Sequence, residues 1–454
     1  MRGATTVRGV NNEGSQRRSR GDVLVDRLAA FLVRSLYREV DVHTSSAAAT
    51  DGPAVVVSNH FGGVADALVL FGVLPRRPGV VARDTIWANR FVGAALDALG
   101  AIPVHKRSDG GGGASNDAMF ASCHQALIDG GDVLIFPEGV TRNEPSMAPV
   151  KTGAARIALG ASSAGCEGLV VVPVGIHYEN KAALRSRVFV NVGVPISIDD
   201  FIAERAGSSA NPVTSDDHES VNDLNDCIAT ALHRVAPNYD DWTEQHLLTH
   251  AAEVTVRALG DEPRATIDRG LRDRLANTLA DRSAHDRAVI CEKTARYRND
   301  LDAIGYTDAE LVGRISTGRL VADLFVQLLL GLVILPFAFV GAVINVIPFL
   351  VVRLIGSRPL SPSMMATVKP LAAAGAFGLT WAVVMWFAWR AVGWPGPLLA
   401  LLLLPVYLAA VIALVDRATV MWRMVRRRRA RPSGDGLADD VIEARRAVIE
   451  VVAA

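Results

Sequence analysis

The sequence predicts an α/β domain followed by a helical region and then by membrane helices. Between residues 54 and 194, short β-branched runs alternate with Ala-rich helical stretches such as 91–99 and 116–128. This alternation is typical of a sheet layered with helices. Beyond residue 200 the segments become charged and helix-periodic, and long apolar runs follow from about residue 324. We therefore expect a mixed sheet covered by helices, a helical linker domain and an α-helical membrane region.

The composition supports a membrane portion. Half of the 454 residues are hydrophobic and the mean hydropathy is +0.26, which is more apolar than a typical soluble enzyme. Lys plus Arg and Asp plus Glu are equal at 47 each, so the net charge gives no support to nucleic-acid binding. The expected segments are a disordered N-terminus (1–20), the α/β domain with an amphipathic first helix (21–200), a helical linker or packing domain (201–316), a membrane region (317–420) and a basic cytoplasmic tail (421–454).

The N-terminal segment lacks the apolar core that a secretory signal requires, so we expect it in the cytoplasm. Residues 22–38 then place apolar side chains on one helical face, with arginines at its edge. Such a helix either lies on anionic lipid or packs on the α/β domain, and the two interpretations are compatible. The apolar residues are Leu24, Leu28, Phe31, Leu32 and Leu36, and the arginines are Arg27, Arg34 and Arg38.

The most informative segment is Ser58–Asp66, which follows the apolar run Ala54–Val57. It presents His60 and Asp66 just after a predicted strand. A histidine that donates one ring nitrogen to a carboxylate is held in one tautomer, and its other nitrogen is available to take a proton from an alcohol or thiol. His60 is therefore a candidate general base and Asp66 its orienting partner.

Three further segments accompany this pair. Residues 100–107 end in His105-Lys106-Arg107, residues 134–142 contain Phe136-Pro137-Glu138-Gly139 and end in Arg142, and residues 170–175 read Val-Val-Val-Pro-Val-Gly. In this order and spacing the four segments resemble the glycerolipid acyltransferase superfamily, which contains lysophosphatidic acid, glycerol-3-phosphate and dihydroxyacetone-phosphate acyltransferases. The resemblance covers roughly residues 50–200.

The resemblance implies that residues 21–200 are an acyltransferase domain. Such a domain moves a fatty acyl group from an acyl-coenzyme A or acyl-carrier-protein thioester to glycerol 3-phosphate or a lysophosphatidic-acid-type acceptor in phospholipid synthesis. It also implies that Glu138 and Gly139 help to form the acceptor site. No nucleophile elbow and no Cys beside His60 is present in the sequence, so direct attack by the acceptor is the simpler reading. The thioester is a co-substrate, and no metal or other cofactor is expected.

The sequence departs from the commonest family pattern at several positions. Five residues separate His60 from Asp66 instead of four, as in the branch that looks like fungal and bacterial glycerol-3-phosphate acyltransferases. This spacing favours glycerol 3-phosphate as the acceptor. Extra glycine in the turn would still let Asp66 return to His60, because glycine tolerates positive φ. The other departures are Gly62 and Gly63 for a frequent Ser, Lys106 for Arg, and Val140 for Thr.

A phosphorylated acceptor requires cations and free backbone N–H groups. The candidate cations are Lys106, Arg107, Arg142 and Lys151, and Thr152-Gly153 would open a helix whose N-terminus favours an anion. The alternative is that Glu138 merely pairs with Arg142 in a loop and that Lys151 is solvated. His246 and His250 are one helical turn apart, but they lack a partner motif for zinc and are interpreted as part of a polar helix.

The apolar segments predict an integral protein of the cell membrane. Residues 371–389 and 398–415 are each long enough to span and should form a transmembrane hairpin. Residues 324–352 exceed one crossing but fall short of two, and Pro336 divides them. Cations flank the hairpin on both sides, so both flanks should be cytoplasmic, like the catalytic domain. Residues 324–352 would then form a re-entrant hairpin bent near Pro336, and the alternative is one long tilted span.

A second functional class is a transport-associated protein or an inactive membrane scaffold that carries an acyltransferase-like domain. Transport would predict ionisable residues inside the spans, whereas these segments offer only weak polar candidates such as Gln327 and Asn345. The four cysteines show no paired spacing and suit a reducing cytosol. Scaffolding stays open as the alternative to catalysis.

Overall fold

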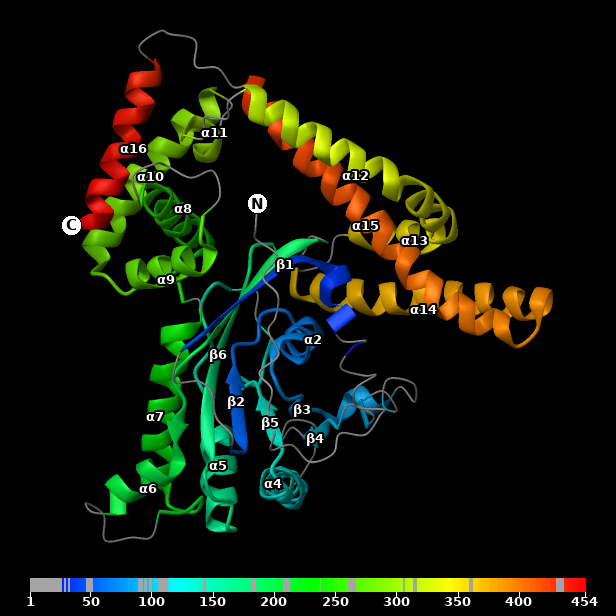
Figure 1. Cartoon of the computed structure of the whole chain (residues 1–454). Coiled ribbons are helices and arrows are strands. Elements are labelled where there is room, and N and C mark those ends of the chain that lie inside the picture. The colour runs from blue at the N-terminus through cyan, green and yellow to red at the C-terminus, as the bar shows by residue number, and fades with distance from the viewer. Residues whose placement is uncertain are drawn as a thin grey trace. The chain divides into compact units, whose positions relative to one another are not determined.

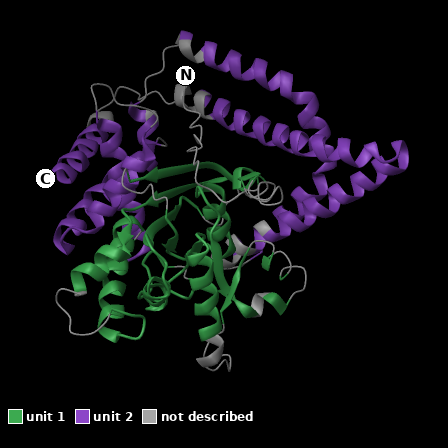
Figure 2. Cartoon of the chain, turned by 60° about the horizontal axis from the view of Figure 1, so that its bottom comes forward, with its two compact units in different colours: residues 1–238 green, residues 239–454 purple. Residues whose placement is uncertain are grey.

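The protein is described by a computed structural model that forms two compact units, residues 1–238 and residues 239–454 (Figure 2). The expected disordered segment 1–20 lies outside the described residues, as does part of the basic tail. The structure describes residues 27, 30–31, 33–45, 52–88, 93, 96–97, 100–104, 113–141, 144–180, 185–206, 213–236, 238–259, 267–304, 307–312, 317–358, 362–429 and 437–454.

The first unit contains a mixed sheet, eight-stranded in the described residues, in the order β1-β7-β6-β2-β5-β3-β4 with β8 beside β6 (Figure 1). Strand β6 pairs antiparallel with β7 and β8, and the other pairings are parallel. The structure therefore confirms the predicted mixed sheet. The strands are β1 Tyr37–Thr44, β2 Ala54–Ser58, β3 Gly79–Arg83, β4 Ile102–Val104, β5 Asp132–Ile135, β6 Val170–Tyr178, β7 Ser186–Val192 and β8 Ile196–Ser197.

Helices cover both faces of the sheet, which explains why the central strands are continuously apolar. Along β2, Val55 and Val57 join the core under α4, α5 and α7, whereas Ala54 and Val56 join the core under α2. Helix α4 confirms the helix expected at 116–128, and most of 91–99 lies outside the described residues. The helices are α2 Val64–Val73, the 3₁₀ turn η1 Asp84–Ala88, α4 Gly113–Ile128, α5 Gly153–Ser163, α6 Ile198–Ala206 and α7 His218–Val235.

The N-terminal helix ends earlier than expected. Helical residues end at Leu36, and residues 37–44 form β1, which pairs in parallel with β7. The sequence YREVDVHT is largely polar, so it lacks the apolar run by which a strand is usually found. Val33 and Leu36 are buried in the core with α2, so these two side chains pack on the domain. Leu24, Leu28 and Leu32 lie outside the described residues.

Helix α7 packs on the sheet, although it lies beyond the expected end of the α/β domain at residue 200. Val221, Leu224 and Ile228 belong to the same apolar core as β2 and α5. The end of α7 approaches β6 so closely that a Cβ on Gly175 would lie 1.9 Å from the carbonyl oxygen of Val235. The amphipathic pattern of α7 predicts a buried face but does not specify what covers it.

The second unit contains a helical bundle built from residues on both sides of the membrane region. Its helices share one apolar core that includes Leu248, Leu279, Ile290 and Val448. Helix α16, which follows the membrane helices in the chain, therefore packs with helices that precede them. The bundle consists of α8 Trp242–Ala258, α9 Arg269–Ala280, α10 Ala284–Ile304, α11 Asp308–Val312 and α16 Leu437–Ala453.

A buried carboxylate connects α16 to the rest of the bundle. Asp308 is 2% exposed, accepts hydrogen bonds from Arg445 Nε at 2.7 Å and from Tyr297 Oη at 2.6 Å, and pairs with Arg257. Burial by itself would raise the pKa of Asp308, but Arg445 and Arg257 bring it below its usual value. His250, also in this bundle, stacks on Tyr297 with ring centroids 6.0 Å apart.

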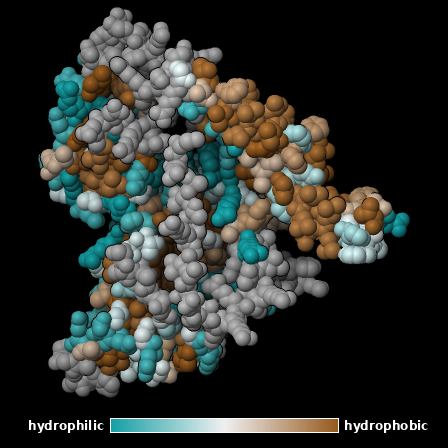
Figure 3. Space-filling model, in the orientation of Figure 1, coloured by the Kyte–Doolittle hydropathy of each residue, from teal (hydrophilic) through white to brown (hydrophobic). Residues whose placement is uncertain are grey.

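Three helices of the second unit are long and apolar enough to cross a membrane, judged by length and composition over the described residues. Their spans are 321–344, 371–392 and 395–422, and their apolar side chains are largely exposed (Figure 3). These helices confirm the predicted membrane association. The three helices are α12 Thr317–Ile344, α14 Pro362–Val392 and α15 Pro395–Arg429, and the shorter apolar helix α13 Val346–Gly356 lies between α12 and α14. The expected spans 371–389 and 398–415 lie within α14 and α15.

The break in the first apolar segment is at Asn345, so the expected bend near Pro336 is wrong. Helix α12 continues through Pro336, since a proline removes only one backbone hydrogen bond and membrane helices tolerate this. At Asn345 the side-chain amide donates to the carbonyl of Gly341 and accepts from Trp381 Nε1 at 3.0 Å. An amide that serves both helices fixes the end of α12.

Helix α13 packs antiparallel to α14, and α12 packs antiparallel to α15. Phe349 of α13 packs edge-on against Phe377 of α14, with ring centroids 5.4 Å apart. Arg417 of α15 donates to Gln327 of α12 at 2.8 Å, and Gly341, near the opposite end of α12, approaches the backbone of Tyr407. The start of α12 and the end of α15 therefore lie at the same end of this pair.

We expect Gly175→Ala to destabilise the first unit by about 2–3 kcal/mol or more, because the new methyl group would meet the backbone of α7 rather than a movable side chain. The thermal denaturation midpoint of the full-length protein in detergent measures the loss. Gly153→Ala is the matched control, since its Cβ would have only an ordinary 3.5 Å contact with Ile135. Equal midpoints for the two variants would contradict the close packing of α7 on β6.

We expect Asp308→Asn to destabilise the bundle by about 3 kcal/mol at pH 7, because it removes the charge that pairs with the buried Arg257 and the partly buried Arg445, of which Arg257 keeps Glu253 as a partner. The lowered pKa of Asp308 means that its contribution is present above pH 3.8 and is lost as the pH falls through the lowered value. Chemical denaturation at pH 7 measures the difference. Asp302→Asn, at an exposed position on α10, should leave stability within about 0.5 kcal/mol of wild type.

Candidate active site

The candidate site lies at the carboxyl-terminal ends of β2, β5 and β6. His60 follows β2, Glu138 follows β5 and Tyr178 ends β6. Because these three strands are mutually parallel, their ends meet at one edge of the sheet. This is the edge at which open α/β sheets bind their ligands.

The structure brings His60 and Asp66 together. His60 Nδ1 lies 2.9 Å from Asp66 Oδ2, the carboxylate is fully buried, and the imidazole is 19% exposed. An ionised carboxylate can only accept, so Nδ1 carries the proton and Nε2 keeps a free lone pair. The imidazole also stacks on Phe136, with ring centroids 4.2 Å apart, which fixes the plane of the ring. This arrangement is competent to remove a proton from a hydroxyl group.

The turn between the two residues depends on its glycines. Gly62 N donates to both oxygens of Asp66, at 3.0 and 2.8 Å, and Gly63 precedes α2 with φ of +64°. Asp66 lies in the first turn of α2, where a negative charge is favoured by the helix dipole. Positive φ at Gly63 is therefore part of how the five-residue spacing closes.

Asn59 fixes the backbone next to His60, and the sequence reasoning did not single it out. Its side chain is fully buried, and it donates to the carbonyl of Ile176 at 2.9 Å and accepts from the Ile176 N–H at 2.7 Å. The amide thus replaces one residue pair of the β2–β6 ladder just beyond the end of β2. The sequence feature that could have identified Asn59 is its position just after the apolar run Ala54–Val57. An amide buried there requires hydrogen-bond partners.

The carboxylate of Glu138 connects the loop that carries His60 to the loop that contains Ala148. It is 1% exposed, its Oε1 accepts from His60 N at 2.7 Å, and its Oε2 accepts from Ala148 N at 2.8 Å. Burial raises the pKa of Glu138, and the two backbone donors oppose this rise. With both oxygens occupied by backbone N–H groups, Glu138 positions the residue that carries the imidazole.

Lys151 is the one expected cation that lies within the described residues. It is exposed, and its ammonium borders Gly139, where a Cβ would lie 2.7 Å from Nζ. Gly139 has φ of +63°, and Gly153 begins α5 two residues after Lys151. The structure thus gathers Gly139, Lys151 and Gly153 beside the loop after β5. Lys106, Arg107 and Arg142 lie outside the described residues.

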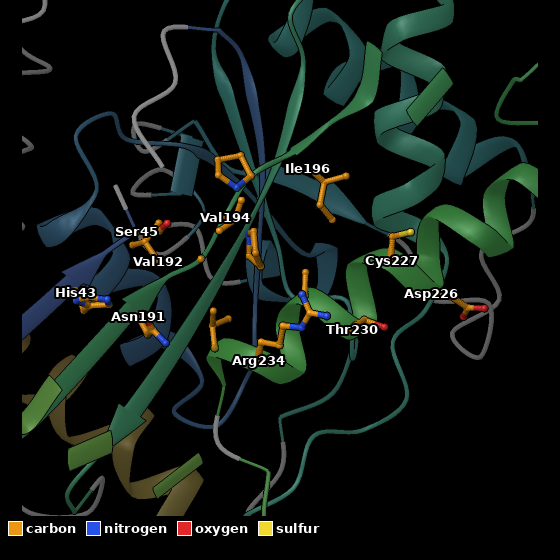
Figure 4. Close-up of a pocket in the computed structure, with 15 residues that line it drawn as sticks. His43, Ser45, Asn191, Val192, Val194, Ile196, Asp226, Cys227, Thr230 and Arg234 are labelled. Carbon is orange, nitrogen blue, oxygen red and sulfur yellow. The ribbon is translucent and has the colours of Figure 1, made fainter. Parts of the chain in front are cut away.

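An apolar cavity of about 630 Å³ lies elsewhere in the first unit (Figure 4). It is lined by residues of β1, β6 and β7, of the segment that leads from β7 into β8, and of α7, and Val192, Val194, Ile196 and Val235 are among its apolar lining residues. His60 and Asp66 are not among its lining residues. The sequence reasoning did not anticipate this cavity, because it depends on the packing of α7 beside β7.

Comparison with known proteins supports the sequence resemblance. A family model described as Acyltransferase matches residues 39–177. Glycerol-3-phosphate O-acyltransferase 2 of Saccharomyces cerevisiae is 36% identical over 129 residues, which cover 28% of this chain and 16% of the yeast protein. Glycerol-3-phosphate O-acyltransferase 1 of the same yeast is 33% identical over 109 residues, which cover 24% and 14%. The chain thus matches less than a fifth of the length of either relative.

Among solved structures, the 1-acyl-sn-glycerophosphate acyltransferase of Thermotoga maritima matches 47% of this chain and 78% of its own, with 15% identity and a TM-score of 0.33. The family match covers β1 to β6 and includes both His60 and Asp66. Residues 39–177 therefore match an acyltransferase family, in a chain that also carries three helices long and apolar enough to cross a membrane.

Proposed function

We propose that the protein is a membrane-bound O-acyltransferase of phospholipid synthesis that uses His60 as its general base. The observation that carries the proposal is the 2.9 Å contact between His60 Nδ1 and the buried carboxylate of Asp66. This contact leaves Nε2 as the basic nitrogen at the edge of the sheet. The match of residues 39–177 to an acyltransferase family supplies the reaction class.

In this mechanism the acceptor hydroxyl transfers its proton to His60 Nε2 as its oxygen attacks the thioester carbonyl. The resulting imidazolium is stabilised by Asp66, which stays ionised. Collapse of the tetrahedral intermediate breaks the carbon–sulfur bond, and the imidazolium returns the proton to the leaving thiolate. No acyl group passes to the protein, so each turnover consumes one thioester and one hydroxyl and yields an ester and a free thiol.

For the acceptor we propose glycerol 3-phosphate or a lysophosphatidic-acid-type lipid, each of which places a hydroxyl near a phosphate. Lys151 and the N-terminus of α5 supply a positive charge and free N–H groups beside the loop after β5. The names of the yeast relatives favour glycerol 3-phosphate. For the donor we propose an acyl-coenzyme A or acyl-carrier-protein thioester, and the bilayer is the partner of the apolar helices.

We also propose that the catalytic domain and both ends of the membrane region lie on the cytoplasmic face. Helix α11 precedes the membrane helices and α16 follows them, yet Asp308 and Arg445 are in contact at 2.7 Å in one bundle. If α12, α14 and α15 all crossed, α11 and α16 would lie on opposite faces. The Asp308–Arg445 contact therefore supports an even number of crossings, and the arginines near the end of α15 favour the cytoplasmic face.

We expect the purified full-length protein to transfer a labelled acyl group from acyl-coenzyme A to glycerol 3-phosphate, lysophosphatidate or both. His60→Ala should lower turnover by roughly 10²–10⁴-fold, because the hydroxyl then attacks without a base. His233→Ala, at an exposed histidine on α7, is the matched control and should retain wild-type turnover. Product formation on thin-layer plates measures both.

Two results would contradict this proposal. Absence of transfer to every phosphorylated acceptor, by a folded protein with either donor, would favour the alternative of an inactive membrane scaffold. Equal turnover by wild type and His60→Ala would remove His60 from the mechanism.

We expect the first unit and α16 to be protected together from a membrane-impermeant maleimide in sealed right-side-out vesicles. Cys227, an exposed native cysteine on α7, reports the first unit, and Ala454→Cys in a Cys227→Ser background reports the end of the bundle. Both should react only after the vesicles are opened. Labelling of one but not the other in sealed vesicles would show an odd number of crossings.

A further inference from the structure

Two tyrosines lie next to the hydrogen-bonded pair at the site, Tyr37 buried and Tyr178 partly buried. Tyr178, the last residue of β6, donates its hydroxyl proton to Asp66 Oδ1 at 2.7 Å. Tyr37, the first residue of β1, lies beside Tyr178, and the two ring centroids are 5.9 Å apart. The hydrogen-bonded chain therefore runs from Tyr178 through Asp66 to His60, and Tyr37 packs against its outer end.

The direction of these hydrogen bonds follows from the number of protons available. The ionised carboxylate of Asp66 has none, so the single hydroxyl proton of Tyr178 must point toward Asp66. Burial raises the pKa of both tyrosines, with the charge of Asp66 as a further cause, so both hydroxyl groups keep their protons at neutral pH.

Gly62 provides the space in which the hydroxyl of Tyr178 reaches the carboxylate. A Cβ at position 62 would lie 2.6 Å from Asp66 Oδ1 and 2.9 Å from Tyr178 Oη, closer than such atoms approach. Any larger side chain would displace one group or the other. The glycine at this position, where the family resemblance leads one to expect serine, is thus matched to a tyrosine from a distant strand.

We propose that Tyr178 is a positioning residue that sets the orientation of Asp66 and the strength with which Asp66 holds protonated His60, with Tyr37 as its support. The inference rests on the proposed role of His60 as the base. Asp66 shares its charge among His60, the Gly62 N–H and Tyr178. Among the described residues, the buried Glu138 and Tyr37 also interact electrostatically with Asp66. A carboxylate shared in this way holds the imidazolium less tightly, so the imidazolium can return its proton to the leaving thiolate.

The test compares Tyr178→Phe with Tyr37→Phe in the full-length protein. Without the hydroxyl of Tyr178, Asp66 interacts more strongly with the imidazolium form of His60. A higher pH is then required to remove the proton from Nε2. We expect the acid limb of the kcat profile to move up by on the order of one pH unit in Tyr178→Phe, which lowers turnover roughly ten-fold on that limb. In Tyr37→Phe the donor to Asp66 is retained, and the shift should be smaller in the same direction. KM for the acceptor should not change.

A second readout does not require turnover. Diethyl pyrocarbonate modifies histidine only when the imidazole is neutral, and mass spectrometry identifies which histidine has been modified. The pH of half-maximal modification of His60 should rise by on the order of one unit in Tyr178→Phe. Exposed His233 in the same sample should show no change.

These two measurements separate the inference from the proposed function. If wild type shows no turnover but the modification of His60 shifts as expected, the proposed reaction fails and the positioning role stands. If wild type is active and neither the kcat profile nor the modification of His60 moves in Tyr178→Phe, the positioning role is overturned and His60 remains the base. A loss of kcat in Tyr178→Phe without either shift would assign Tyr178 a purely structural role and would also overturn the inference.

Discussion

The fully buried charge of Asp66 is the constraint on which the arrangement of the site depends. An ionised carboxylate without solvent must be surrounded by donors, and unpaired it would cost several kcal/mol. The donors come from separate parts of the first unit: the turn before α2, the residue after β2 and the end of β6. Satisfying this one group therefore fixes the end of β6 relative to the end of β2. The orientation of the imidazole follows from that packing.

Glu138 and Asn59 extend the same logic to the backbone. Both side chains are buried, and each pairs its polar atoms with N–H or carbonyl groups of a neighbouring segment. His60 is consequently held at its main chain by Glu138, at its ring by Asp66 and across its face by Phe136. Catalytic groups need this support, because small displacements of a base reduce its effect strongly.

Local sequence patterns predicted the α/β class, the apolar central strands and the pairing of His60 with Asp66, because each depends on residues close together in the chain. They did not predict β1, whose polar sequence forms a strand only because β7 offers an unpaired edge. They also did not place Asn59, Tyr178 or Tyr37 at the site, since these contacts join residues more than a hundred positions apart. Pro336 was expected to break α12, but a helix among apolar neighbours tolerates proline, and Asn345 competes more effectively for the backbone.

The joining of Asp308 to Arg445 has a consequence for biosynthesis. These partners are 137 residues apart, and helices α12 to α15 lie between them. During translation, α8 to α11 are synthesised before α16. Until α16 is made, Asp308 can pair with Arg257 but not with Arg445. The bundle can close only after insertion is complete. Under the proposed topology, α16 could join the bundle only in molecules whose membrane region leaves Asp308 and Arg445 on the same side of the bilayer.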